Sequence, residues 1–325
     1  MTNPRFCVLV VGAGAIGARY DTPDSPYVLT HAHGFCAHPG FRLAGFVDTD
    51  GARAREAARL WGGRSFGNLE EAFRAEQVDI VSIAVPDELH FDFLMQVAAL
   101  PVRAVFTEKP LTTRLNDART ILEQYAVCRI PVCVNYRRSF VPEFEVLRES
   151  VQKQAFGKYL TGAGYYGKGL LHNGSHLIHL LCSLFGDVVG HTIVAAENDF
   201  SVDDPTISAT LLFDGGKGFN LRHVSSSRFV LFEVDLIFDA GRVRITDTGF
   251  RIEYHAPVAH EAFKDFRFLT KGKDVETSLG RSLHYSASNI YNHLTLGEPL
   301  KCGLAEAFRT MMICDRIRSS VVGTA

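Results

Sequence analysis

Lys109 is the residue whose type and neighbours best suit proton chemistry. It follows an apolar run that predicts a strand over 102–107, and Pro110 after it holds it extended. An ammonium group at a strand end can stabilise or protonate an oxygen that develops negative charge. We therefore expect Lys109 to be catalytic and to touch substrate; the alternative is a solvated surface lysine.

Three histidines follow in a glycine-rich segment. Gly174 or Ser175 can start a helix, which places His176 in the first turn, where the positive helix end favours a neutral ring that can accept a proton. We expect His176 to be catalytic; the alternative is that these histidines only satisfy polar positions. His172, His176 and His179 have a spacing that could suit a metal. Gly174 is expected to break the helix, however, and no Cys or carboxylate lies close, so no metal is predicted.

Arg137 and Arg138 follow a predicted strand over 131–134. Paired arginines at such a place can bind a phosphate or a carboxylate, because the guanidinium group forms bidentate hydrogen bonds with both. A salt bridge at the entry to a helix is an equally good explanation for either arginine. Both are therefore candidate substrate-binding residues.

The start of the chain supplies a frame for these groups. Residues 6–11 are apolar and rich in β-branched side chains, which predicts a strand buried on both faces. The glycines that follow have the G-x-G-x-x-G spacing, in which the first allows a tight turn, the second lets a pyrophosphate approach and the third packs helix on strand. The positive helix end faces the phosphates. The residues expected at the cofactor are Gly12, Gly14, Ala15, Ile16 and Gly17.

Asp48 is the acid expected to bind the adenosine ribose. It ends a predicted strand over 42–47 but lies 31 residues after Gly17, where about 20 is usual. The proline-rich segment 21–27 accounts for the excess and reads as an inserted loop, either a flap over the cofactor or a passive insertion. Asp48 would repel a 2′-phosphate, and the nearest arginine is Arg53. We therefore predict NAD rather than NADP.

Alternating strands and helices up to residue 135 predict a doubly wound parallel sheet of the Rossmann type, a domain over 1–135. Ligands bind such sheets at the carboxyl ends of the strands. That edge should carry the glycine-rich turn, Asp48, Pro86, Glu108, Lys109 and Asn135, and we expect Pro86 and Glu108 to contact the cofactor as well.

Residues 136–325 form the predicted second domain, for substrate and oligomer contacts. It has a linking helix over 141–153, one apolar helix over 175–185, and a C-terminal helix at about 304–321 that packs back on the body. The segments between are strand-like, with hairpin turns at 214–217 and 239–242. An α/β chain with an α+β second domain on a largely antiparallel open sheet is therefore expected. The predicted strands are 159–166, 191–196, 206–214, 218–225, 230–239 and 241–246.

The composition narrows the class of protein. A length of 325 residues, 46% hydrophobic content and 22% charged residues are typical of a globular protein of two domains. The net charge of −2 predicts neither nucleic acid nor membrane as a partner, and no apolar run is long enough for a membrane helix. The first apolar run stops at Gly12, so no signal peptide is expected. Seven cysteines without a C-x-x-C pair favour reduced thiols in the cytoplasm.

Several motifs together carry a family resemblance; in chain order they are Gly12, Gly14 and Gly17, Asp48, Val85-Pro86, Glu108-Lys109-Pro110 and Gly174-Ser-His176. With these motifs the chain resembles the Gfo/Idh/MocA family of glucose–fructose oxidoreductases and inositol dehydrogenases. The resemblance covers essentially the whole chain. It implies a Rossmann domain and an open antiparallel sheet whose outer face mediates homodimer or homotetramer contacts. It also implies a nicotinamide-dependent dehydrogenase or reductase of sugars or cyclitols, with Lys109 at the substrate hydroxyl, a cis peptide before Pro110 and His176 as the catalytic histidine.

Two positions depart from that family. Its usual pattern D-x-G-x-H-x-x-D has aspartates where this chain has His172 and His179. His172 and Asn173 then become candidate substrate contacts. The sequence H-N-G-S-H is more similar to members that act on activated sugars in surface-polysaccharide biosynthesis than to inositol dehydrogenases.

The expected protein is a cytoplasmic NAD(H)-dependent oxidoreductase that moves a hydride between nicotinamide and a ring carbinol or ketone of a sugar. A nucleotide-linked sugar is the first choice, with Lys168, Arg137 and Arg138 available for its phosphates. One alternative is the same reaction on a free sugar or inositol. Another is a catalytically silent NAD-binding sensor, which would need neither Lys109 nor His176.

Overall fold

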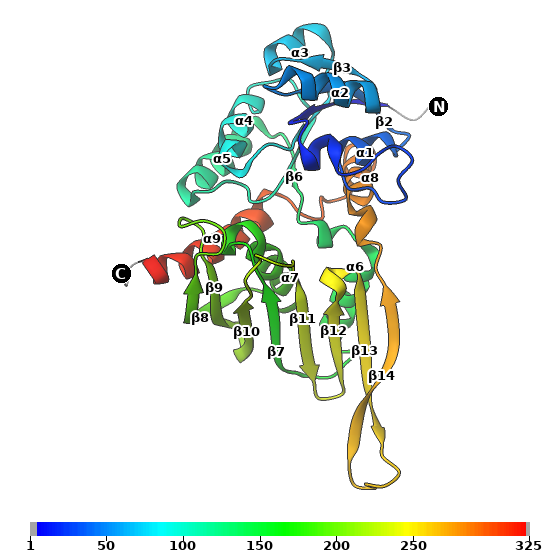
Figure 1. Cartoon of the computed structure of the whole chain (residues 1–325), viewed down its shortest axis with the longest axis vertical. Coiled ribbons are helices and arrows are strands. Elements are labelled where there is room, and N and C mark those ends of the chain that lie inside the picture. The colour runs from blue at the N-terminus through cyan, green and yellow to red at the C-terminus, as the bar shows by residue number, and fades with distance from the viewer. Residues whose placement is uncertain (1–4, 323–325) are drawn as a thin grey trace. The chain divides into compact units, whose positions relative to one another are not determined.

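The computed structural model describes residues 5–322 and divides the chain into two compact units (Figure 1). The first unit contains the chain up to Phe140 together with Gly280–Arg309. The second contains Val141–Leu279 and the chain from Thr310.

The first unit is built on a six-stranded sheet in the order β3-β2-β1-β4-β5-β6, and every neighbouring pair is parallel. Every residue of β1, β4 and β5 is buried, because helices cover both faces of a parallel sheet. The predicted Rossmann-type sheet is confirmed. Its strands are β1 (Phe6–Val11), β2 (Phe41–Val47), β3 (Arg64–Phe66), β4 (Ile80–Ile83), β5 (Ala104–Thr107) and β6 (Val132–Val134).

Helices cover the two faces of this sheet. Figure 1 shows α4 and α5 on one side of it and α1 and α8 on the other. Polar side chains start several of these helices: Thr30 caps α1, Asp50 caps α2 and Asn68 caps α3, each accepting a backbone N–H of the first turn. The helices are α1 (His31–Cys36), α2 (Gly51–Trp61), α3 (Leu69–Ala75), α4 (His90–Val97), α5 (Leu115–Cys128) and α8 (Ser282–Leu296).

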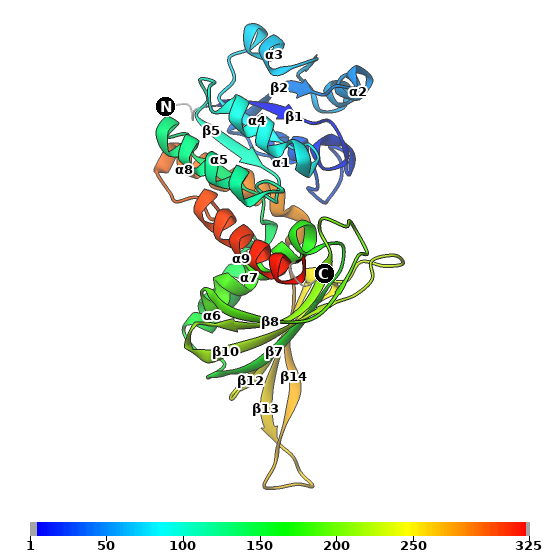
Figure 2. The ribbon, with the colours of Figure 1, turned by 90° about the vertical axis from the view of Figure 1, so that its left-hand side faces the viewer.

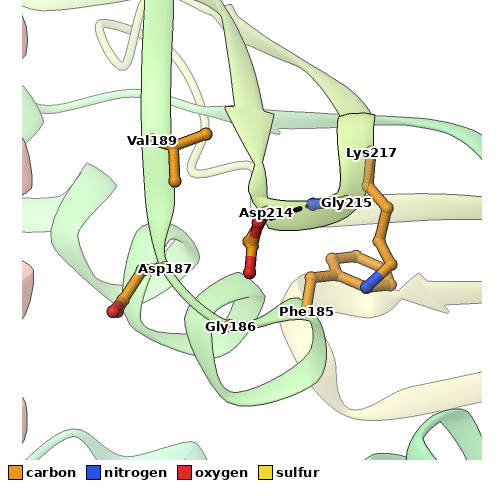
Figure 3. A pocket seen from close by; sticks show the side chains of 7 residues that line it. All are labelled: Phe185, Gly186, Asp187, Val189, Asp214, Gly215 and Lys217. Atoms are coloured by element: carbon orange, nitrogen blue, oxygen red, sulfur yellow. Dashed lines mark hydrogen bonds between the residues drawn. The ribbon is translucent and has the colours of Figure 1, made fainter.

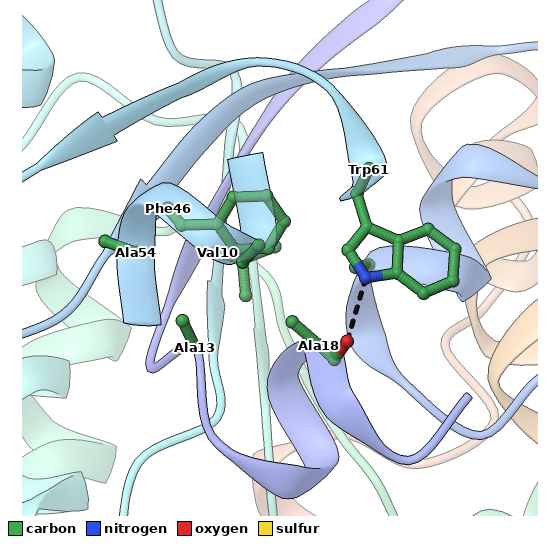
Figure 4. Packing of buried hydrophobic residues seen from close by; sticks show 8 residues of the cluster. Val10, Ala13, Ala18, Phe46, Ala54 and Trp61 are labelled. Carbon is green, nitrogen blue, oxygen red and sulfur yellow. Dashed lines mark hydrogen bonds between the residues drawn. The ribbon is translucent and has the colours of Figure 1, made fainter. Parts of the chain in front are cut away.

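A small apolar cluster packs against the glycine-rich turn (Figure 4). Val10 and Phe46 come from β1 and β2, Ala13 and Ala18 come from the turn itself, and Trp61 ends α2. The indole Nε1 of Trp61 donates a hydrogen bond to the Ala18 carbonyl oxygen at 2.8 Å. The tryptophan of this chain is therefore part of the packing that holds the turn.

Helix α8 belongs to the first unit, although the predicted boundary placed all of 136–325 in the second domain. Leu283, Ala287 and Ile290 are fully or almost fully buried, and a Cβ on Gly34 of α1 would meet the Leu283 backbone at 2.9 Å. No helix was predicted here, because serines, histidines and asparagines interrupt its apolar positions. Its burial against α1 outweighs the weak local pattern.

The second unit holds an eight-stranded sheet in the order β14-β13-β12-β11-β7-β10-β9-β8. Only β7 and β10 run parallel among its described pairs, so the largely antiparallel prediction is confirmed. Figure 2 shows α6 (Pro142–Gln152) and α7 (Ser175–Phe185) on one face. The other face leaves Leu160, Val194 and Leu212 exposed. The strands named here first are β7 (Tyr159–Tyr166), β8 (Val188–Glu197), β9 (Thr206–Phe213), β10 (Lys217–His223), β11 (Glu233–Phe238) and β12 (Gly241–Thr246).

Two elements complete the second unit. The hairpin of β13 (Arg251–Ala259) and β14 (Arg267–Glu276) was not predicted, because most of β14 is exposed on both sides and shows no alternation of apolar residues. Helix α9 (Leu304–Val322) was predicted, and from Thr310 onward it belongs to this unit, where Arg316 donates to the Val188 carbonyl oxygen. None of the helices within 5–322 combines the length and apolar character that a membrane span requires.

Candidate active site

The three glycines after β1 have the environments that their motif requires. Gly12 has φ +94°, and a Cβ there would collide with the Ala84 carbonyl oxygen. A Cβ on Gly17 would collide with the Gly12 carbonyl oxygen, whereas nothing lies within 4 Å of a Cβ built on Gly14. Two glycines are thus required by packing, and the middle one leaves open space beside the backbone.

The chain after Gly14 forms a five-residue π-helical turn over Ala15–Arg19 rather than a regular helix. Gly14, Ala15 and Ile16 keep accessible surface, while Gly17 and Ala18 are buried. The accessible residues of the turn are therefore the ones that the sequence motif predicts to lie at the phosphates of a dinucleotide.

Asp48 lies beside this turn in spite of its late position in the sequence. Its Oδ2 accepts a hydrogen bond from the Ala13 N–H at 2.9 Å, and its Oδ1 accepts one from the Asp50 N–H at 2.8 Å. Arg53 Nη2 lies 3.5 Å from Oδ1, and its side chain is 42% exposed. Arg53, which in the sequence was only the nearest arginine after Asp48, is therefore an ion-pair partner of Asp48.

Asp21 closes the base of the inserted loop. Its Oδ2 accepts hydrogen bonds from the Leu29 N–H at 2.6 Å and from His33 Nδ1 at 2.8 Å. Its Oδ1 accepts the hydroxyl of Thr30 at 2.6 Å. Tyr27, within the loop, is exposed. The loop is therefore tied to the start of α1, and its action as a flap stays a prediction.

Glu108, at the end of β5, is the centre of a buried polar network. Its Oε1 accepts hydrogen bonds from His31 Nε2 at 3.0 Å and from Asn135 Nδ2 at 2.5 Å. His31 Nδ1 lies 2.7 Å from Ser82 Oγ, so α1, β4, β5 and the end of β6 meet here. Burial acts to raise the pKa of Glu108, but His31, Lys109 and Asn135 outweigh it and lower this pKa to about 2.

Lys109 is half-buried next to this network, and the peptide bond between it and Pro110 is cis, as the family resemblance implies. The buried ring of His90 lies between two backbone carbonyls: its Nδ1 is 2.6 Å from the Pro110 oxygen and its Nε2 is 3.1 Å from the Val85 oxygen. His90 thereby joins the segment after β5 to the segment that leads into Pro86.

The two arginines after β6 differ in accessibility. Both lie in a short 3₁₀ turn over Arg137–Ser139, where Arg138 is 6% exposed and Arg137 is half-buried. Burial lowers the pKa of Arg137, while the Glu108 carboxylate acts in the opposite direction. Arg137 is therefore the one with surface available to a ligand.

In the second unit, carboxylates far from the motif hold the loop between β7 and α7. Asp204 Oδ1 accepts the Leu171 N–H at 2.7 Å and its Oδ2 accepts the His172 N–H at 2.8 Å. Asp199 Oδ2 accepts the Lys168 N–H at 3.0 Å. Neither aspartate was predicted from the sequence, because both lie in the polar run between β8 and β9 and no motif spacing marks them.

Phe200, also missed, brings two predicted substrate residues together. Its ring stacks on the His172 ring at a centroid distance of 4.7 Å and an angle of 22°. Lys168 Nζ lies 5.8 Å from the same ring centroid, and the lysine is exposed. Asn173 donates from Nδ2 to the Gly167 carbonyl oxygen at 2.8 Å. Lys168, Phe200 and His172 thus form one accessible aromatic and basic patch.

His176 lies in the first turn of α7, as predicted, and is half-buried. Gly174 does not break the helix, however. It has helical angles (φ −59°, ψ −28°) and ends a π-helical turn over Leu170–Gly174 that runs directly into α7. The reason for glycine is steric, since a Cβ there would meet the Tyr166 ring at 2.5 Å. His179 is buried, and its Nδ1 lies 3.1 Å from Thr310 Oγ1.

A pocket of about 580 Å³ lies at the other end of α7, between Phe185 and Gly186 and the turn from β9 to β10 (Figure 3). Asp187, Asp214 and Lys217 line it together with Val189 and Gly215. It contains no residue that the motifs point to, and His176 lies at the opposite end of the helix. The chemistry argues for the motif residues rather than for this pocket. Within 5–322, no three His, Cys, Asp or Glu side chains are grouped as metal ligands would be.

Known proteins resemble this chain in two ways. Residues 6–136 match the Gfo/Idh/MocA family model, described as an oxidoreductase family with an NAD-binding Rossmann fold. An inositol 2-dehydrogenase of Corynebacterium glutamicum is 33% identical over 161 residues, which are 48% of this chain and 44% of that relative. The chain thus spans less than half the length of that curated relative.

Solved structures share the fold over nearly the whole chain. UDP-N-acetylglucosamine 3-dehydrogenase GnnA from Acidithiobacillus ferrooxidans has a TM-score of 0.75 at 18% identity, covering 97% of both chains. An oxidoreductase from Agrobacterium radiobacter, in complex with NAD+, L-tartaric acid and magnesium, has a TM-score of 0.78 at 15% identity, covering 99% of this chain and 97% of that one. At these identities the likeness concerns the fold alone.

Proposed function

We propose that the protein is an NAD(H)-dependent dehydrogenase or reductase of a sugar, of the Gfo/Idh/MocA family whose model residues 6–136 match. One observation carries the proposal. The glycine-rich turn after β1, Asp48 after β2 and Lys109 after β5 all follow strands of one parallel sheet, so they share its carboxyl edge. Ligands of such sheets bind at that edge.

The residues at this edge fit a nicotinamide dinucleotide. Space is open at Gly14, and Asp48 lies against the same turn. Asn135 Oδ1, buried at the end of β6, has no hydrogen-bond partner among the described residues, and so leaves an acceptor that an amide of a ligand could satisfy. We further propose NAD rather than NADP, because the Asp48 carboxylate would repel a 2′-phosphate. Pro86 and Glu108 are proposed as further cofactor contacts.

Nicotinamide, when bound, accepts or returns the hydride. Lys109 is proposed to hold the substrate oxygen through its ammonium group and to stabilise the negative charge that develops there on oxidation. The Glu108 carboxylate beside it, with its pKa at about 2, keeps a negative charge at every working pH and so favours the charged ammonium.

His176 is proposed as the group that takes the hydroxyl proton on oxidation and returns it on reduction. His176 is half-buried in the first turn of α7. The family aspartates on either side are replaced by His172 and His179, of which His179 is buried against Thr310. His172 is therefore proposed as a substrate contact, together with Asn173.

For the substrate we propose a nucleotide-linked sugar. The support is the patch of Lys168, Phe200 and His172, in which a cation and an aromatic ring are both accessible, and the partly accessible Arg137. Arg138 is the weaker phosphate candidate, because it is buried. The resemblance to inositol 2-dehydrogenases favours a free cyclitol as the second candidate. A homodimer or homotetramer in the cytoplasm remains part of the proposal.

The test is a panel of UDP-sugars, free sugars and myo-inositol, offered with NAD+ and followed by NADH absorbance. We expect turnover with a nucleotide sugar and a KM that rises with salt, because ions screen phosphate recognition. Turnover of uncharged polyols alone, with a KM insensitive to salt, would select the second candidate. NAD binding without turnover on any substrate would favour the silent sensor.

A further inference from the structure

We propose that Asp204, in the loop between β8 and β9, is a positioning residue of the substrate site: it holds the turn before α7 in one arrangement and thereby places His172 for the substrate. The inference rests on the proposed role of His172 as a substrate contact. Asp204 itself is only 8% exposed, and it acts through the backbone of the turn rather than on the substrate.

The backbone before α7 is held by the loop that contains Asp204. Five consecutive N–H groups, those of residues 168–172, all donate to it. Asp199 Oδ2 accepts the first at 3.0 Å and Thr206 Oγ1 accepts the second at 2.7 Å. The Pro205 carbonyl oxygen accepts the third at 3.1 Å, and the two carboxylate oxygens of Asp204 accept the fourth and the fifth at 2.7 and 2.8 Å. Because the buried N–H groups among them must keep a partner, this loop fixes the segment.

Asp204 lies unusually close to the backbone that it holds. Gly169 has φ +78°, and a Cβ there would collide with Asp204 Oδ2. Burial raises the pKa of the Asp204 carboxyl, and the hydrogen bonds from the Leu171 and His172 N–H groups act in the opposite direction. Burial of a carboxylate costs free energy that such bonds offset. The carboxylate and the turn therefore hold each other in place.

The same loop contacts His172 at two points. Asp204 accepts its backbone N–H, and the ring of Phe200 stacks on its imidazole ring. His172 belongs to the π-helical turn Leu170–Gly174, whereas His176 lies in α7 itself. Loss of Asp204 should therefore displace His172 more than His176, and it should weaken substrate binding more than the reaction step.

Two substitutions of Asp204 grade the effect. Asp204→Ala removes both acceptors. Asp204→Asn keeps the size of the side chain but can accept only one of the two N–H groups, because its amide nitrogen is a donor. Asp203→Asn is the matched control, since it makes the same change at the neighbouring aspartate, which is exposed.

Amide hydrogen exchange of the protein without ligand measures whether the turn is held. In Asp204→Ala we expect the amides of Leu171 and His172 to exchange about tenfold faster or more, because each loses a hydrogen bond to a charged group. Asp204→Asn should give a smaller increase, and Asp203→Asn none. The amides of β1 should keep their wild-type rates, which separates local loosening of the turn from unfolding of the whole chain.

Kinetics measure whether the held turn serves the substrate. The probe is the UDP-sugar that wild type turns over fastest, or myo-inositol if no UDP-sugar is turned over. Asp204→Ala should raise KM by about 10- to 100-fold, the factor by which a hydrogen bond to a charged group favours the arrangement that binds. The kcat and the Kd for NAD should stay within about threefold of wild type. A merely structural role would lower the free energy of unfolding without this split between KM and kcat.

His172→Ala separates the inference from its premise. If His172→Ala raises KM while Asp204→Ala keeps the wild-type KM, the positioning role is wrong and the proposed function stands. Unchanged exchange at Leu171 and His172 in Asp204→Ala would also overturn that role. If His172→Ala keeps the wild-type KM, or if wild type turns over no sugar or cyclitol, the premise fails and the inference fails with it. Should Asp204→Ala not fold, Asp204→Asn decides: wild-type KM and exchange rates in that variant would overturn the proposal.

Discussion

Single residues at the carboxyl edge of the first sheet carry most of the chemical argument. Lys109, Glu108 and Asp48 each follow a strand, and each has a charged neighbour that sets what it can do. Lys109 is influenced by the Glu108 carboxylate, and Asp48 is paired with Arg53. Substitution of one partner therefore tests the role of the other.

Lys109→Ala should lower kcat by about 10²- to 10⁴-fold and leave the Kd for NAD nearly unchanged, because the ammonium is proposed to act on charge that develops during the reaction. Lys109→Arg should rescue little, since the planar guanidinium keeps its proton and needs more room. Steady-state kinetics and NAD titration measure both effects. Lys158→Ala, an exposed lysine of the second unit, is the control; turnover of Lys109→Ala within a few-fold of wild type would remove Lys109 from the mechanism.

Wild type should bind NAD(H) more tightly than NADP(H), and Asp48→Asn should reduce that preference. The asparagine oxygen can still accept the Ala13 N–H, while the loss of the negative charge leaves Arg53 able to pair with a 2′-phosphate. Fluorescence of Trp61, which packs under the turn, gives the Kd values. Tighter binding of NADP(H) by wild type would refute the assignment of Asp48.

At the scale of elements, α1 and the ends of β4, β5 and β6 are joined through one buried carboxylate. The pKa of Glu108 is about 2 in the folded chain and 4.5 in a model peptide, so the unfolded chain binds the proton more readily. Its contribution to stability is present above pH 4.5 and is lost as the pH falls from there to about 2.

Glu108→Gln should therefore destabilise the first unit near neutral pH by about 2–4 kcal/mol, and the difference from wild type should shrink as the pH falls below about 4. Urea unfolding followed by Trp61 fluorescence at several pH values measures it. A difference that is the same at pH 7 and pH 3 would contradict the assignment of this carboxylate as the ionised centre of the network.

The loop between β8 and β9 is the second element with a testable role, because it supplies Phe200, which stacks on His172. Phe200→Ala should raise the KM for the proposed sugar substrate by about tenfold, the scale of a lost aromatic contact, with a smaller change in kcat. Phe263→Ala, an exposed phenylalanine between β13 and β14, is the control. An unchanged KM would exclude the patch from the substrate site.

At the scale of the whole chain, the first unit includes a helix from a segment, Gly280–Arg309, that follows 139 residues of the second unit after Phe140. Ile290 of α8 is completely buried, whereas Leu296 of the same helix is 69% exposed. Burial against α1, rather than helix propensity, accounts for the position of this helix.

Ile290→Ala should lower the free energy of unfolding reported by Trp61 by about 2–5 kcal/mol, as expected for a cavity in a core. Leu296→Ala should change it by less than about 0.5 kcal/mol. Denaturant titrations of the two variants give the comparison. An equal, small effect of both substitutions would show that α8 does not stabilise the first unit.

The sequence by itself determined the features that depend on short-range patterns. The run before Gly12 and the spacing to Gly17 specified a strand and a turn, since glycine alone fits those backbone positions without collision. Apolar runs likewise specified the parallel strands, and the tripeptide at Lys109 and the start of α7 at Ser175 were located by residues a few positions away. In each case the physical cause lies within one element or its immediate neighbours.

Only the tertiary structure decided which distant residues meet. His31, Ser82 and Asn135 surround Glu108 because four chain segments converge at one sheet edge. Asp204 and Phe200, from the loop between β8 and β9, contact the loop before α7. The partners of a buried carboxylate or of an aromatic ring are the groups that the fold places within about 3–5 Å of it. The spacing of residues along the sequence does not predict those partners. The same reason explains α8, whose interrupted apolar pattern becomes a buried face only when α1 lies against it.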